Sequence, residues 1–197
     1  MPEIRAATAD DVPAVGRVLA AAFHGDPVWS WLASPRANWD RRASAWFAAE
    51  ARSQLLGHGT VLIDTDQRGA AVWSPPKRWR ASTAEGLRLL VPSARLFRAR
   101  SLRSIRLITA IEKLHPKPEH WYLAVVGTDP AHQGSGVGSA LITTMTDRCD
   151  AEGLPAYLES SKESNLAFYA RHGFEVRDEV RQPGGPTLWT MWREPKG

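Results

Sequence analysis

The sequence has a single cysteine, Cys149, among its 197 residues. One thiol excludes an internal disulfide framework and a metal cluster built on cysteine pairs. No apolar stretch approaches the roughly 20 residues that a membrane-spanning helix needs, and the first residues lack the apolar core of a secretion signal. These absences predict a soluble, cytoplasmic protein that does not act at a membrane.

A strong charge of either sign is also absent. The 25 basic and 21 acidic residues leave a net charge of +4, which suits an anionic ligand but does not require nucleic acid. Repeats, low-complexity segments and linkers that would divide the chain are lacking as well. Hydrophobic residues make up 43%, so we expect one domain over residues 1–197. Histidine and acidic residues do not occur at metal-ligand spacing, and no metal is expected.

A strand, a glycine-rich turn and a helix are predicted within residues 121–142. Residues 121–126 are rich in aromatic and β-branched types, as in a buried strand. Asp129-Pro130 breaks this strand, because proline has no N–H to donate. The turn 133–138 reads Gln-Gly-Ser-Gly-Val-Gly and precedes an amphipathic helical pattern. Glycines let the backbone approach an anion, and the free N–H groups of a first helical turn point at it, so this segment predicts a phosphate site.

Three phosphate-binding patterns contain turns of this kind. A Walker loop ends in Gly-Lys-Ser/Thr, but no lysine occurs from residue 118 to residue 161. The dinucleotide fingerprint would have Ser139 at its third glycine position and belongs in a first βαβ unit. The third pattern is Gln/Arg-x-x-Gly-x-Gly/Ala, and Gln133, Gly136 and Gly138 match it at every fixed position. In this the turn resembles the pyrophosphate cradle of the GNAT-superfamily N-acetyltransferases.

A second motif downstream resembles the same family. A predicted strand over 155–161 is followed by Asn165-Leu-Ala-Phe-Tyr169 and by Gly173-Phe174. An asparagine, an apolar pair, Phe-Tyr and a Gly-Phe exit are similar to the second GNAT signature, in the right order after the first. Three shorter stretches narrow the resemblance to the puromycin N-acetyltransferase-like branch: 115–121, 132–134 and 158–161.

The resemblance implies a GNAT fold of mixed α/β class. Its single sheet would have about seven mostly antiparallel strands, helices on both faces, a splayed central strand pair, and a core cofactor region over 121–176. It also implies acetyl-CoA as co-substrate and, from the closer branch, a small-molecule amine as acceptor. Alternatives are a peptide or protein amine and a non-catalytic acetyl-CoA-sensing module. We expect a monomer or homodimer without nucleic acid or membrane partners.

The resemblance assigns roles along the cofactor. Backbone groups of Val126 and Thr128 would bind the pantetheine arm as an added strand does, and the Val126 N–H would polarise the thioester oxygen. Asn165 would also reach the pantetheine arm. The backbone amides of the cradle would hold the pyrophosphate: Gln133, Gly134, Ser135, Gly136, Val137, Gly138 and Ser139.

Two side chains are candidates for proton transfer. Tyr169 is the candidate general acid, because a phenol is able to protonate a thiolate of lower basicity; alternatively its hydroxyl is structural. Glu159 is the candidate base, with His120 or a water molecule as alternatives. A carboxylate at this position would equally suit binding of a cationic amine.

The acceptor pocket is expected to involve the first half of the chain. Helices predicted over 12–23 and 27–32 would form one wall, by resemblance to the family. Alternatively, the aromatic residues there belong to the core, and the aspartate at position 26 caps the second helix. The pocket candidates are Phe23, Asp26, Trp29 and Trp31, joined by His120.

The remaining pattern predicts further helices and strands. A helix over 41–56 would bury one face with Ala45, Trp46, Ala49 and Leu56, and a hairpin would follow over 60–64 and 69–73. Strands over 174–180 and 187–192 would complete the sheet. Residues 84–114 look helical with a break at Pro92. Their arginines offer a nucleic-acid surface as an alternative reading, but apolar residues between them favour an amphipathic helix with a solvated basic face: Leu96, Leu102, Ile105, Leu107 and Ile108.

Overall fold

The structure is a computed structural model, which describes residues 2–33, 38–56 and 59–196. Seven strands form one sheet in the order β1-β2-β3-β4-β5-β7-β6. Neighbouring strands are antiparallel except β4 and β5, which run parallel. The strands are β1 (Ile4–Ala6), β2 (Thr60–Asp64), β3 (Gly69–Ser74), β4 (Trp121–Thr128), β5 (Ala156–Ser160), β6 (Glu175–Arg181) and β7 (Thr187–Arg193). This confirms the predicted fold class.

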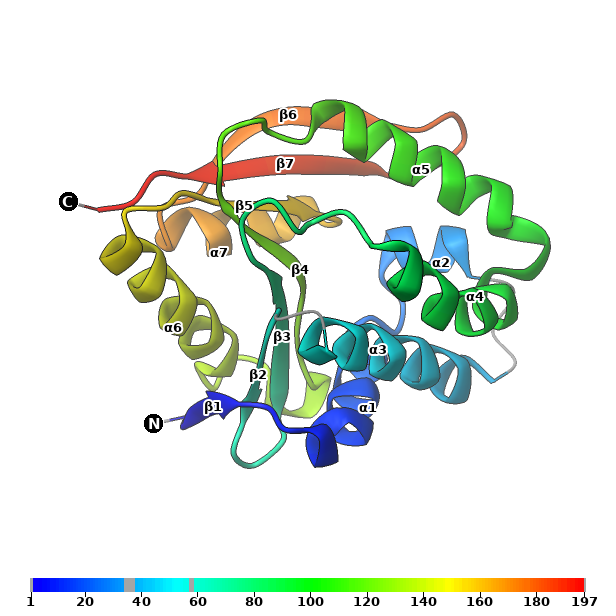
Figure 1. Cartoon of the computed structure of the whole chain (residues 1–197), viewed down its shortest axis with the longest axis horizontal. Coiled ribbons are helices and arrows are strands. Elements are labelled where there is room, and N and C mark those ends of the chain that lie inside the picture. Colours follow the sequence, from blue (N-terminus) through cyan, green and yellow to red (C-terminus); the bar gives the residue numbers. More distant parts are fainter. Residues whose placement is uncertain (1, 34–37, 57–58, 197) are drawn as a thin grey trace.

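Helices cover both faces of the sheet (Figure 1). α6 and α7 pack on one face, and the other helices lie on the opposite one. The α-helices are α1 (Val12–Ala22), α2 (Pro27–Leu32), α3 (Trp39–Leu56), α4 (Thr83–Phe97), α5 (Ser101–Leu114), α6 (Val137–Glu152) and α7 (Leu166–Arg171). None of the helices in the described ranges is both long and apolar enough to cross a membrane.

Two glycines let the helices approach the sheet closely. A Cβ on Gly127 would lie 2.6 Å from the Ala22 Cβ of α1, and a Cβ on Gly69 would lie 2.5 Å from Val137 at the start of α6. Both distances are far below ordinary van der Waals contact. The start of α6, which carries the cradle turn, is therefore fixed against the middle of the sheet.

The central strand changes direction within its length. The register between β3 and β4 shifts after Val72, so that Val72 faces Val125 while Trp73 faces Leu123. Ala124 is the extra residue of this bulge. As a result Leu123 and Val126 both pack in the cluster under α6, and Val125 packs on the opposite face.

The bulge coincides with the end of the parallel pairing. β4 and β5 are paired from Trp121–Ala156 to Leu123–Leu158 and not beyond, although both strands continue. This is the splayed central pair that the resemblance implies. It opens the sheet in its middle.

The buried face of α3 differs from the predicted one. Ala45 is exposed and Leu56 is 60% exposed, whereas Phe47 is fully buried. The core positions are Ala43, Phe47 and Ala51, which recur at every fourth residue and share one helix face. The prediction was wrong for Ala45 and Leu56, whereas Trp46 is partly buried and packs against the core. The small alanines at the core positions gave a weaker signal than tryptophan and leucine.

The break in the long helical segment also lies elsewhere. Pro92 is inside α4, and the helix ends instead at Arg98, whose φ of 49° is left-handed. Arg98–Arg100 form a single 3-10 turn before α5. The carbonyl that the proline leaves without an N–H partner is tolerated because this stretch of α4 lies at the surface.

The apolar residues of this segment do not all face the core. Leu96 and Leu107 are buried, but Leu102, Ile105 and Ile108 are more than half exposed, as are Leu87 and Leu90 of α4. The predicted amphipathic pattern is therefore wrong for these positions, because α4 and α5 pack along only a narrow face.

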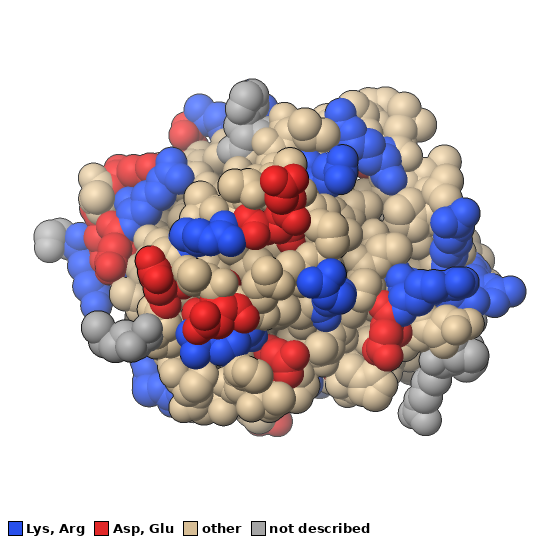
Figure 2. All heavy atoms as spheres, turned by 90° about the horizontal axis from the view of Figure 1, so that it is seen from below, with Lys and Arg blue, Asp and Glu red and all other residues tan. Residues whose placement is uncertain are grey.

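Two arginines of the same segment have a structural role. Arg100 donates to the carbonyls of Ser30 (3.0 Å) and Ala33, and Arg103 donates to that of Trp31 (3.1 Å). These carbonyls lie at the C-terminal end of α2, where helical partners are lacking. The arginines thus fix α2. Figure 2 shows the molecule from below, with basic side chains gathered at the right-hand end of the view.

A largely buried ion pair ties α6 to the last strand. Arg193 is 2% exposed, donates to both carboxylate oxygens of Asp150 (2.7 and 2.6 Å) and also reaches the carbonyl of His172 (2.9 Å). The hydrogen-bonded guanidinium lowers the pKa of Asp150. Removing the carboxylate would leave a buried charge without a partner.

We expect Asp150→Ala to lower the free energy of unfolding by about 3 kcal/mol, the lower end of the range for a broken buried pair, because Asp150 is partly exposed. Glu179→Ala is the matched control, since Glu179 pairs with Arg181 at the surface and should change stability by less than about 1 kcal/mol. Urea denaturation of both variants measures the difference. Equal losses would contradict the assignment.

Candidate active site

A cavity of about 720 Å³ passes through the sheet where β4 and β5 part. Its lining comes from α6 and α7 on one face and from α1, α2 and α5 on the other. This size is in the range of small-molecule sites. The opening of the strands therefore connects two compartments that the sheet would otherwise separate.

The glycine-rich turn forms one end of this cavity. Gly134 and Gly136 have φ of 79° and 86°, and a Cβ on either would meet no atom within 4 Å. The first backbone bond of α6 runs from Ala140 to Gly136 (2.9 Å), so the N–H groups of the preceding helical residues have no intrahelical acceptor. Open space above unpaired N–H groups at a helix start fits a phosphate or pyrophosphate.

The open edge of β4 offers backbone groups beside this turn. Asp129 donates to the carbonyl of Arg68 (2.8 Å), and Thr128 lies opposite Gly69. Bonded and non-bonded pairs alternate along an antiparallel ladder, so the N–H groups of Thr128 and Val126 point away from β3. These two N–H groups face the side of β4 on which β5 is no longer paired. They are therefore free to donate to an extended ligand that lies beside β4 in the place of a strand.

Asp26 fastens α2 at the edge of the cavity. One carboxylate oxygen accepts from the N–H groups of Val28 (2.9 Å) and Trp29 (3.1 Å), and the other accepts from the Ser161 hydroxyl (2.5 Å). Asp26 is thus both the cap of α2, as one reading of the sequence had it, and a lining residue of the cavity. Its bond to Ser161 joins α2 to the loop after β5.

Glu159 lies at the point where the strands separate. Its Oε2 accepts from the Tyr122 hydroxyl (2.8 Å), and its Oε1 is buried without a hydrogen-bond partner among the described residues. Burial raises the pKa of Glu159 from 4.5 to about 7, although the Tyr122 hydroxyl lowers it. A carboxyl group that titrates near neutrality and points into a cavity is suited to accept a proton.

A family model and a curated relative both point to acetyltransferases. Residues 101–174 match the sequence model of the acetyltransferase (GNAT) family. The chain is also 29% identical to an uncharacterized N-acetyltransferase of Schizosaccharomyces pombe, over 95% of this chain and 81% of that protein. These matches support an acetyltransferase of GNAT type.

Solved structures share the fold of this chain. One from Corynebacterium glutamicum, named histone acetyltransferase HPA2 and related acetyltransferase, has a TM-score of 0.74 at 24% identity and covers 100% of this chain and 97% of its own. The C-terminal condensation domain of Ebony has a TM-score of 0.61 at 10% identity, over 98% and 100% of the two chains. At these identities the likeness concerns the fold alone.

Tyr169 lies on α7 at the same cavity as Glu159. It is 8% exposed and packs against Phe168 and Phe174. Burial, and secondarily the negative charge of Asp26, raises the pKa of the Tyr169 hydroxyl above its usual 10. The hydroxyl therefore stays protonated at neutral pH, as a proton donor must.

Most of the predicted site residues line the cavity. Phe23, Trp29 and Asn165 do so, as do the cradle residues except Ser135, whose hydroxyl donates to the His132 carbonyl (2.6 Å). Trp31 lies outside it and packs under the Arg103 guanidinium. The described residues contain no group of acidic, histidine or cysteine side chains that could hold a metal.

His120 also lies outside the cavity. Its Nδ1 donates to the Pro118 carbonyl (2.6 Å), and its Nε2 faces the Nε2 of His115 at 3.0 Å. Burial lowers the pKa of His120, and it lowers the pKa of His115 to about 3. Glu159 and Tyr169 thus line the same cavity, and His120 does not.

Sequence reasoning missed three kinds of lining residue. Tyr122 binds Glu159 only because the parallel register of β4 and β5 sets them near each other. Ser161 meets Asp26 across 135 positions of sequence. Leu107 and Ile111 of α5 reach the cavity from a segment that had no recognisable motif. No local pattern in the sequence signals these contacts.

Proposed function

We propose that the protein transfers the acetyl group of acetyl-CoA to the primary amine of a small molecule by direct attack. GNAT acetyltransferases generally use acetyl-CoA. The observation that carries the proposal is the cavity that joins the anion cradle at the start of α6 to the Glu159 carboxylate through the opened sheet. Membership of the puromycin N-acetyltransferase-like branch is part of this proposal.

In this proposal the cofactor lies along β4. The amides of the turn 133–139 hold the pyrophosphate, and the edge groups of Val126 and Thr128, with Asn165, hold the pantetheine arm. The N–H of Val126 then donates to the thioester oxygen and stabilises the negative charge that develops there. Holding both substrates in one cavity supplies much of the rate.

Two side chains would move protons in this reaction. Glu159 takes a proton from the ammonium group, and the free amine attacks the thioester carbon. The new C–N bond forms and the C–S bond breaks as the intermediate collapses. Tyr169 gives its proton to the departing sulfur, so that CoA leaves as a neutral thiol. The second proton that the nitrogen loses on becoming an amide restores the Tyr169 phenol, and the proton on Glu159 is released to water. The positions of both groups on the cavity wall support these roles.

A peptide or protein amine is the alternative acceptor. The printed name of the Corynebacterium glutamicum relative includes histone acetyltransferase, but its likeness extends only to the fold. A cavity enclosed by α2, α5 and the sheet favours a small acceptor over an extended chain. A panel containing alkylamines, arylalkylamines and lysine peptides separates the two classes.

The test combines binding with turnover. We expect acetyl-CoA to bind in calorimetry in preference to nicotinamide dinucleotides and nucleoside triphosphates. We then expect amine-dependent release of CoA thiol with at least one small amine. Acetyl-CoA binding without release for any amine or peptide would favour the sensing module, and turnover of peptides alone would favour a protein acceptor.

We expect Gly136→Asp to weaken acetyl-CoA binding by well over tenfold, more than ~1.4 kcal/mol. The new carboxylate would stand in the open space over the cradle and repel the pyrophosphate. Gly153→Asp is the matched control, because Gly153 is also left-handed (φ 63°) with open space around it but lies at the far end of α6. Equal affinities for both folded variants would remove the cradle assignment.

A further inference from the structure

The side of the cavity away from the cradle is strongly apolar. It is formed by α1, α2 and α5 together with the start of β7. Glu159 points to this same face, because its neighbour Leu158 packs in the cluster under α6. Aliphatic and aromatic side chains make most of this surface: Phe23, Val28, Trp29, Leu32, Ile111 and Leu188. A ligand here exchanges water for hydrocarbon contact.

One acidic group on this side already has both of its oxygens occupied by hydrogen bonds. Asp26 uses one oxygen for two backbone N–H groups of α2 and the other for the Ser161 hydroxyl. A bound ammonium group would have to displace one of these bonds. Asp26 is therefore a poor partner for a cationic substrate.

Glu159 is different because one of its oxygens accepts no hydrogen bond within bonding distance among the described residues, although the nearby Tyr157 hydroxyl helps to lower its pKa. Tyr122 occupies Oε2, while Oε1 is buried without a partner among the described residues. The further charged side chains on the cavity wall are Lys162 and Arg171, which repel a cation. Among the described residues of the cavity wall, Glu159 is therefore the one carboxylate available to an ammonium group, and it lies beside a hydrocarbon surface.

We propose that the acceptor is a hydrophobic monoamine, with a primary amine on an alkyl or aryl body and no second positive charge. This inference rests on the proposed N-acetyl transfer. The amine meets Glu159, and the body of the molecule extends between α2 and α5. A second ammonium group at the far end of the body would lose its water among aliphatic side chains without a carboxylate to replace it.

A matched pair of substrates tests the charge requirement. Hexylamine and 1,6-diaminohexane have the same length and differ in one terminal ammonium group. We expect kcat/KM for hexylamine to exceed that for the diamine by at least tenfold. From propylamine to hexylamine, each added methylene should raise kcat/KM about fourfold, as expected for burial of one CH₂ group.

A matched pair of variants tests the surface itself. Ile111 of α5 lines the cavity, whereas Ile108, three positions earlier, is 55% exposed and does not. Ile111→Glu should lower kcat/KM for hexylamine by at least tenfold and raise the relative rate of the diamine, because it supplies a second carboxylate. Ile108→Glu should leave both rates unchanged.

The outcomes separate this inference from the proposed function. Turnover that is equal or faster with the diamine, or that is independent of chain length, would overturn the monoamine assignment while N-acetyl transfer stands. If no amine is turned over, calorimetry in the presence of CoA decides. Hexylamine binding more tightly than the diamine would support the inference although the function fails, and equal or weaker binding would overturn it.

Discussion

Tyr169→Phe is expected to lower kcat by at least about 100-fold while acetyl-CoA affinity stays nearly constant, because general acid catalysis typically contributes 10² to 10⁴ in rate. The substitution removes one hydroxyl and keeps the ring that packs against Phe168 and Phe174. Steady-state kinetics with a saturating amine, beside calorimetry with acetyl-CoA, measure the two quantities. A thiolate leaves readily, so the loss should lie nearer the lower figure.

The pH profile gives a second reading of the same variant. Burial raises the pKa of Tyr169 above 10, so its deprotonation should not limit the wild-type rate below pH 10. Around neutral pH, kcat of Tyr169→Phe should be lower than that of the wild type by the same factor at every pH. Any change in the shape of the pH–rate profile should be confined to its alkaline limb. A Tyr169→Phe protein with full rate and an unchanged profile would show that the hydroxyl is structural.

Glu159→Gln should lower kcat/KM by about 10² to 10⁴ at pH 8, the usual contribution of a general base. The wild type should lose activity tenfold per pH unit below about 7, where the carboxylate takes up its proton. The variant should lack this acid limb, because glutamine does not titrate in this range. A Glu159→Gln enzyme that keeps the limb would assign it to another group.

Protonation of the same carboxyl group, which removes activity, should stabilise the folded protein. Its pKa is raised from 4.5 to about 7 in the folded protein, so the folded state binds the proton more tightly than the unfolded one. This stabilisation is complete below pH 4.5 and is lost as the pH rises to 7. Glu159→Gln should therefore gain stability over the wild type across this window, and urea denaturation at pH 5 and pH 8 should show it. A constant difference would contradict the raised pKa.

The strand, cradle and helix around residue 136 could be predicted because their signals are local. Glycines at left-handed positions, a proline after the strand and an apolar period each act within a few residues. The same holds for α7, where Asn165 and Tyr169 were expected and both line the cavity. These elements carry the catalytic and cofactor predictions.

The acceptor side could not be predicted, because contacts distant in sequence form it. α5 reaches the cavity through Leu107 and Ile111 only after two helices fold back over the sheet between β3 and β4. Its neighbouring residues Ile105 and Ile108 have the same chemistry but face solvent. Sequence pattern alone does not distinguish an aliphatic residue that lines a cavity from one that remains outside.

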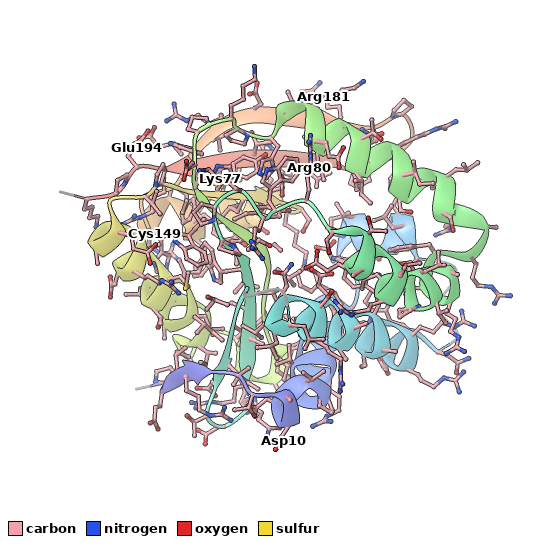
Figure 3. All side chains as sticks on the ribbon, viewed as in Figure 1. Asp10, Lys77, Arg80, Cys149, Arg181 and Glu194 are labelled. Atoms are coloured by element: carbon pink, nitrogen blue, oxygen red, sulfur yellow. The ribbon has the colours of Figure 1, made fainter. Side chains whose placement is uncertain are left out.

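The single cysteine has a practical consequence for the laboratory. Cys149 lies on α6 (Figure 3), is 0% exposed, and burial raises the pKa of its thiol to about 12. A thiol-reactive dye attacks thiolates that it can reach, so it should find no target in the folded chain. The colour that the dye produces during turnover therefore reports the released CoA thiol, with almost no contribution from the protein. In a sample without substrate, the rate at which colour appears measures how often the core opens and exposes the Cys149 thiol.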